Sequence, residues 1–98
     1  MQLEFGNARL RKAFEKRSEA IHEFGEAIGK KYVMALQLVK QAKSPDDLYK
    51  IPQLRFHPLK GNREGEYSAT LTGNWRLIMT FPADDTARIE KVEDYHGR

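Results

Sequence analysis

The sequence predicts a single α+β domain over residues 1–98, in which helices come first and strands follow. Between residues 8 and 42, apolar residues recur at spacings of three and four, which is typical of amphipathic helices. From residue 67 onward, apolar and polar residues largely alternate, as they do in strands that bury one face. We therefore expect an N-terminal strand and a helical hairpin, with the hairpin packed on one face of a small, mainly antiparallel twisted sheet.

The composition is that of an ordinary globular domain. The chain has 98 residues, of which 40% are hydrophobic and 32% are charged, and these values indicate one modest core. The lack of cysteine excludes disulfides and thiolate metal sites. No apolar run approaches the roughly 20 residues of a membrane span, and the N-terminus lacks a signal-peptide core. We expect a cytoplasmic protein that makes no membrane contact.

The first elements follow from local patterns. Residues 1–5 form the expected opening strand, and a first helix follows from Asn7, whose side chain is a good N-cap. A second helix is predicted over residues 20–42, with a break between the two helices near Ser18. Gly25 and Gly29 weaken this second helix but permit close approach of its neighbour.

The middle of the chain contains turn signals. Ser44 and Pro45 predict the start of one helical turn, which Pro52 ends. Residues 53–65 then form a loop punctuated by proline and glycine, and its length suggests a functional role.

Three strands are expected at the end, over residues 66–72, 74–81 and 87–96, with a hairpin turn at Gly73-Asn74. We expect the helices to cover the face of Trp75, Leu77 and Met79, which leaves the Arg76 face open. Ile89 and Val92 have opposite parity, which indicates a bulge. Past the bulge, strand geometry puts Val92, Asp94 and His96 on one side and Tyr95 on the other.

The second half also concentrates groups that transfer protons or bind phosphate. These candidates are His57, Lys60, Arg63, Arg76, Asp94, Tyr95 and His96. RNA cleavage needs such groups: a base takes the 2′-OH proton, cations stabilise the phosphorane, and an acid protonates the leaving 5′-oxygen. This chemistry requires no metal or other cofactor. A metal site built from His57, Asp94 and His96 has the right ligand types but no metal-specific spacing.

Each candidate also has an ordinary structural explanation. His57 precedes a proline and can cap a turn, while Lys60 and Arg63 can be solvated loop charges. Arg76 can serve as an ion-pair partner, and His96 lies three residues from the chain end. No single residue decides between the two interpretations.

Three motifs taken together resemble the HigB branch of the RelE toxin superfamily. They are HPLKGNREG at residues 57–65, GNWRLIMTF at 73–81 and EDYH at 93–96, and they occur in the family's order and spacing. The resemblance covers about the C-terminal 45 residues specifically. It implies the RelE-like microbial ribonuclease fold, which agrees with the architecture expected above, and a toxin of a type II toxin–antitoxin pair that cleaves mRNA in the ribosomal A site without a metal.

The resemblance also implies roles for individual residues. His57 and His96 would carry the proton transfers in an unassigned direction, and Lys60 and Arg76 would hold the scissile phosphate. Tyr95 would stack on or orient a base, and Asp94 would orient an imidazole. Arg63 is a weaker candidate for contact with the RNA backbone. Gly97-Arg98 extends past the histidine that ends many members, and Arg98 could add a phosphate contact.

The expected partners are mRNA, the ribosome and an antitoxin. Arg9, Lys12 and Lys16 on the first helix form a candidate surface for ribosomal RNA. The antitoxin would be a HigA-like helix-turn-helix protein, through which the complex would bind operator DNA. Two alternatives stay open: a non-catalytic nucleic-acid-binding or repressor module on the same fold, which would not need His57 and His96, and a topoisomerase-targeting toxin, which would not need the histidine and lysine of HPLK.

Overall fold

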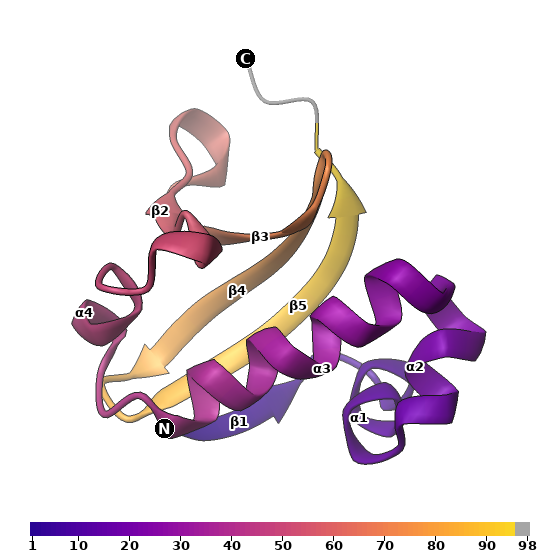
Figure 1. The fold of residues 1–98 in the computed structure, drawn as a ribbon. Coiled ribbons are helices and arrows are strands. Elements are labelled where there is room, and N and C mark those ends of the chain that lie inside the picture. Colours follow the sequence, from indigo (N-terminus) through magenta and orange to yellow (C-terminus); the bar gives the residue numbers. More distant parts are fainter. Residues whose placement is uncertain (96–98) are drawn as a thin grey trace.

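The computed structural model describes residues 1–95 and confirms the α+β class, with helices packed on one face of a five-stranded sheet (Figure 1). The helices are α1 (Ala8–Glu15), α2 (Arg17–Phe24), α3 (Glu26–Gln41) and α4 (Pro45–Leu48), with 3₁₀ turns η1 (Pro52–Leu54) and η2 (Gly61–Arg63). The strands are β1 (Gln2–Phe5), β2 (His57–Pro58), β3 (Tyr67–Thr72), β4 (Trp75–Ala83) and β5 (Thr86–Asp94). Their order is β1-β5-β4-β3-β2; β1 is parallel to β5, and the other pairs are antiparallel.

The predicted N-cap and first helix are confirmed, but the long second helix is wrong. Asn7 Oδ1 accepts a hydrogen bond from the Leu10 amide at 2.9 Å and so begins α1. The helical conformation is interrupted at Lys16, two residues before the expected position, and again at Gly25. Gly25 adopts φ 84° and ψ 166°, which lies outside the helical region and divides the expected helix into α2 and α3.

Gly29 serves the predicted close approach. A Cβ atom at this position would lie 2.7 Å from the Ala20 carbonyl oxygen, so only glycine lets α3 pack this tightly against α2. Ala20 is itself fully buried.

The main core lies between α3 and the sheet. Tyr32, Leu36 and Val39 of α3 are fully buried, and so are Leu77 and Met79 of β4. The helices therefore cover the predicted face of the sheet.

The predicted irregularity in β5 is a bulge at Glu90. Ile78 pairs with Lys91, but the next residue, Met79, pairs with Ile89, so Glu90 is an extra residue. The bulge changes the parity of the strand, which lets Ile89 and Val92 pack on the same core.

The opposite face of the sheet is less open than predicted. Ile78 and Ser68 share this face with Arg76 and are fully buried, although Ile78 does not belong to the main core. Residues 53–65, which the sequence predicts to be a loop, contribute to the burial of this face. They contain β2 at the sheet edge, and Leu59 N–H donates to the Glu66 carbonyl at 2.8 Å to close residues 59–66 into a compact lobe.

Candidate active site

A salt bridge connects the 59–66 lobe to β5, a strand that is not adjacent to β2 in the sheet. Arg63 of the lobe follows edge strand β2, whereas its partner Glu93 lies on β5, which β3 and β4 separate from β2. Arg63 Nη1 and Nη2 donate to the two oxygens of Glu93 at 2.6 and 2.9 Å. Because Glu93 pairs with Arg76, the lobe lies on the Arg76 face, and this contact brings the first motif to the other two.

His57 is exposed on the edge strand and pairs with Ser68. Its Nδ1 lies 2.8 Å from the Arg55 carbonyl oxygen, which can only accept a hydrogen bond. The proton of the neutral ring is therefore assigned to Nδ1, and Nε2 is left as the acceptor. A ring held in this tautomer can take a proton at Nε2.

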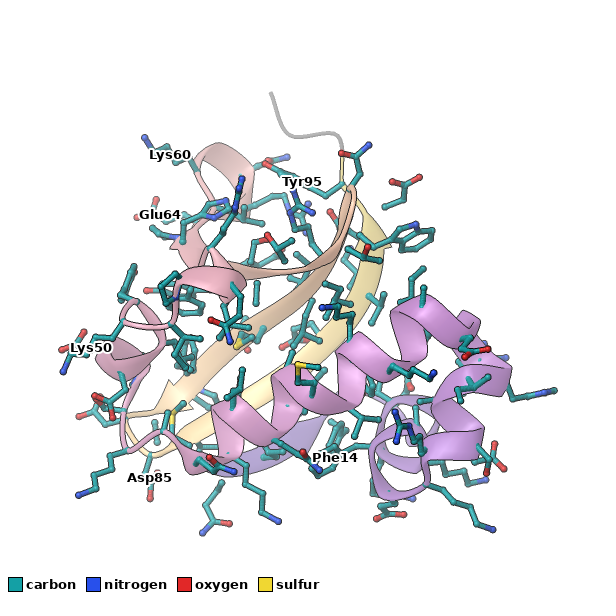
Figure 2. All side chains as sticks on the ribbon, viewed as in Figure 1. Phe14, Lys50, Lys60, Glu64, Asp85 and Tyr95 are labelled. Atoms are coloured by element: carbon teal, nitrogen blue, oxygen red, sulfur yellow. The ribbon has the colours of Figure 1, made fainter. Side chains whose placement is uncertain are left out.

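Lys60 precedes η2, and its exposed side chain extends away from the sheet at the upper edge of the molecule (Figure 2). Because its neighbour Arg63 is anchored to β5, the backbone of Lys60 is fixed relative to the sheet while its ammonium reaches solvent. A lysine in this position can meet a phosphate as a mobile point charge.

Arg76 lies on β4, where it pairs with Thr70 on one side and Glu93 on the other. Its Nη1 donates to the carbonyl oxygens of Gly73 at 2.6 Å and Trp75 at 3.2 Å. The side chain thus folds back along the start of its own strand, beside the hairpin turn.

The last described residues continue the sheet. Tyr95 N–H donates to the Asn74 carbonyl at 2.8 Å, so pairing extends one residue past β5. Asp94 pairs with Trp75, and Val92 pairs with Leu77, which agrees with the predicted alternation. This register puts Asp94 on the helix-covered side of the sheet and Glu93, rather than Asp94, beside Arg76. His96 and the Arg98 extension lie outside the described residues. The metal set considered above, which the sequence does not favour, includes His96 and so stays untested.

Arg63 and its acidic partners form the strongest electrostatic feature of this site. Arg63 Nε also donates to Glu66 at 2.8 Å, and Arg63 Cζ lies 5.9 Å from the centre of the Tyr95 ring. Hydrogen bonds from Arg63 hold the pKa of Glu93 below its ordinary value, and Lys91 acts in the same direction. The bonds to Glu93 in turn raise the pKa of Arg63.

Glu66 and Glu93 were missed as site residues because the sequence shows them only as surface acids. The hairpin register offers a signal, since pairing β5 with β4 across the bulge places Glu93 opposite Arg76. Nothing in the sequence indicates that Arg63 reaches across two strands.

The cations of α1 and of its C-cap residue Lys16 belong to a different part of the surface. Lys12 and Lys16 are exposed, and Arg9 lies 4.0 Å from Glu23 of α2. Figure 1 places α1 among the helices, away from β2 and η2. The structure does not bring these three residues together with His57 and Lys60.

Within residues 1–95, no group of three histidine, aspartate or glutamate side chains is arranged to hold a metal ion. The helices in the same range are too short or too polar to cross a membrane.

Comparisons with known proteins agree with the motifs and the fold. The family model described as the RelE-like toxin of the type II toxin–antitoxin system HigB matches residues 3–96. Endoribonuclease HigB of Proteus vulgaris is 50% identical over 42 residues, which are 43% of this chain and 45% of that protein. The match thus spans less than half of the relative's length.

Solved structures share the fold at low identity. The YoeB/ParE toxin from Agrobacterium tumefaciens superposes with a TM-score of 0.63 at 15% identity, covering 99% of this chain and 100% of that chain. A chain of the YoeB-YefM complex from Staphylococcus aureus superposes with a TM-score of 0.62 at 21% identity, covering 99% and 98%. With the family match over nearly the whole sequence, the chain belongs to the HigB-like family of RelE-like toxins of type II toxin–antitoxin systems.

Proposed function

We propose that the protein is a ribosome-dependent endoribonuclease that cleaves mRNA in the decoding A site. The observation that carries the proposal is the salt bridge between Arg63 and Glu93. It joins the lobe that contains Lys60 and follows His57 to the strands that bear Arg76 and lead to Tyr95. Family membership and the endoribonuclease name of the Proteus vulgaris relative support the reaction class.

The proposed reaction is attack of a 2′-oxygen on the adjacent phosphorus. A base removes the 2′-OH proton, the new O–P bond forms, and the bond to the 5′-oxygen breaks as an acid protonates that oxygen. His57 and His96 serve as the acid and base. Nε2 of His57 accepts a proton when the ring is neutral and donates one when the ring is protonated. Both roles use only proton transfer, so the proposed reaction needs no metal ion.

Lys60 and Arg76 stabilise the negative charge that grows on the phosphorane. Arg76 lies on the face that the lobe crosses, where its guanidinium can present a fork to phosphate oxygens. Tyr95 provides a ring for a neighbouring base. Asp94 lies on the other side of the sheet from His57, so the imidazole that we propose it orients is that of His96.

We further propose that α1 contacts ribosomal RNA through Arg9, Lys12 and Lys16, with a salt-dependent attraction that does not depend on sequence. The protein would act in the cytoplasm, where ribosomes are found. Its inhibitor would be a HigA-like helix-turn-helix antitoxin that carries the complex to operator DNA. A YoeB-YefM complex among the structural relatives supports a protein partner.

The test is to map mRNA 5′ ends in a translation extract with the wild type, His96→Ala, His57→Ala and Arg76→Ala. We expect cuts within translated codons for the wild type and their loss in the three variants. Arg88→Met is the matched control, because Arg88 is a half-buried β5 arginine that pairs with Glu4 and Glu90. Intact mRNA with the wild type would contradict the proposal. Growth arrest that survives His96→Ala but not Arg76→Ala would instead indicate a non-catalytic binder.

A further inference from the structure

Arg63 has almost no hydrogen-bonding capacity left for a ligand. Its Nη1, Nη2 and Nε donate to Glu93 and Glu66, and Nη2 also lies 2.7 Å from Glu66 Oε1. The side chains of Arg63 and Glu93 are only 26% and 19% exposed. A guanidinium has five N–H donors in a fixed fork, and here the fork faces carboxylates. Direct contact of Arg63 with the RNA backbone is therefore a poor account of this residue.

Glu93 lies at a position where it could disable Arg76. The two residues are directly paired across β5 and β4, so their side chains leave the same face of the sheet. Residues paired in this way have Cβ atoms about 4.5–5.5 Å apart, which is within reach of a salt bridge. Nevertheless, within residues 1–95, no carboxylate lies within 4.0 Å of the Arg76 guanidinium, which binds backbone carbonyls instead.

We propose that Arg63 is a positioning residue that binds Glu93 and thereby keeps Arg76 available to phosphate. Both oxygens of Glu93 are taken by Arg63, and Lys91 Nζ lies 3.3 Å from Oε1. The same guanidinium lies 5.9 Å from the centre of the Tyr95 ring, where a cation–π interaction favours this position of the ring. This inference rests on the proposed role of Arg76 in phosphate binding.

Removal of Arg63 should redirect Glu93 to Arg76. The carboxylate would lose its bidentate partner in a half-enclosed position, and the nearest paired arginine would replace it. The Glu93 carboxylate would then neutralise the charge of Arg76, and Arg76 would bind phosphate weakly. Removal of Glu93 as well should release Arg76 again, which is an outcome that a direct RNA contact from Arg63 does not predict.

The kinetic test is a double-mutant cycle of Arg63→Met and Glu93→Gln on the ribosome-dependent cleavage reaction. We expect Arg63→Met to lower kcat/KM by at least about tenfold, and Glu93→Gln in the same chain to restore most of that loss. Arg88→Met, which removes a β5 arginine with two acidic partners elsewhere, should leave kcat/KM unchanged. A loss that Glu93→Gln does not restore would overturn the proposal.

A second measurement does not depend on activity. The pKa of Glu93 can be followed by carbon NMR of its carboxyl group in Arg63→Met and in Arg63→Met/Arg76→Met. If Arg76 replaces Arg63, the pKa of Glu93 is lower in the single variant than in the double variant. Equal values would overturn the proposal even if the wild type cleaves RNA.

The two measurements also separate this inference from the proposed function. A wild type that cleaves no RNA, combined with the expected NMR difference, would contradict the function but keep the rearrangement of Glu93. If Arg63→Met does not fold, Arg63→Lys replaces it in both measurements, because an ammonium keeps the charge but cannot hold both oxygens of Glu93. Cleavage by Arg63→Lys at the wild-type rate would then overturn the proposal.

Discussion

Tyr32 of α3 connects to α1 through a buried hydrogen bond. Its side chain is fully buried, and its hydroxyl donates to the Leu10 carbonyl of α1 at 2.7 Å. Its ring lies 5.0 Å from that of Phe24, and burial raises its pKa. A phenol in this position contributes through one hydrogen bond and much apolar area, so it has a structural role rather than a catalytic one.

The Tyr32 hydrogen bond predicts a measurable loss of stability. Tyr32→Phe keeps the ring but removes the donor, and we expect it to lower the free energy of unfolding by about 1–2 kcal/mol. Tyr49→Phe is the control, because Tyr49 is 51% exposed and should change stability by less than about 0.5 kcal/mol. Urea unfolding measures both, and equal values for the two variants would contradict the role of the buried bond.

Glu93 predicts a pH dependence. Its pKa in the folded protein lies below the ordinary value of 4.5, so the pair with Arg63 is fully stabilising above about that pH. Stability from this pair is lost as the pH falls through the folded pKa. Urea unfolding should therefore show a smaller drop between pH 7 and acidic pH for Glu93→Gln than for the wild type. The same drop in both would show that the pair contributes nothing.

Candidate site residues can be predicted from the sequence where their chemistry is local. His57 and Lys60 stand out by type within a loop motif, and Arg76 stands out within a strand. Arg63 was predicted to contact RNA because a loop arginine looks the same in the sequence whether its partner is a phosphate or a distant carboxylate. Only the fold places Glu93 within 2.6 Å of it.

At the scale of elements, two glycines in one helical pattern have different structural roles. Gly25 separates α2 from α3 with a positive φ, whereas Gly29 stays helical and packs closely against the backbone of Ala20. The sequence predicted a close approach but not the break, because a glycine inside an amphipathic pattern is compatible with either. The bulge in β5 was predictable, because Ile89 and Val92 are three residues apart and can face the same core only if the strand contains an extra residue.

Gly29→Ala tests the contact between α2 and α3. In an open helix this substitution stabilises by up to about 1 kcal/mol, but here the new methyl group meets a backbone oxygen that cannot rotate away. We expect it to lower the free energy of unfolding by about 1–3 kcal/mol. Ala27→Gly, at an exposed position of α3, measures the ordinary propensity difference. Stabilisation by Gly29→Ala would contradict the close approach.

The surface of α1 predicts a salt dependence of ribosome binding. If Lys12 and Lys16 contact rRNA phosphates, alanine at both positions should flatten the slope of log affinity against log salt by about 0.7–0.9 per lost contact. Arginine at both positions keeps the charge and should preserve the slope. An unchanged slope in the alanine variant would exclude α1 from the contact.

At the scale of the whole molecule, the fold brings together three segments that are far apart in the sequence. The helices occupy one face of the sheet, and residues 59–66 lie beside β2 at its edge (Figure 1). From there the Arg63 side chain reaches Glu93 near the end of β5, beside the start of β4. The order of helices and strands was predictable from hydrophobic periodicity. The route of the lobe was not, because it depends on the register between strands that are not neighbours in the sequence.

The most direct test of the central claim is single-turnover cleavage of mRNA bound to programmed ribosomes. The wild type and Arg88→Met should cut the A-site codon at the same rate, and His57→Ala and Arg76→Ala should each be slower by at least about 100-fold. Ribosomes without the protein show the background. Cleavage by His57→Ala and Arg76→Ala at the wild-type rate, or no cleavage by the wild type, would contradict the account.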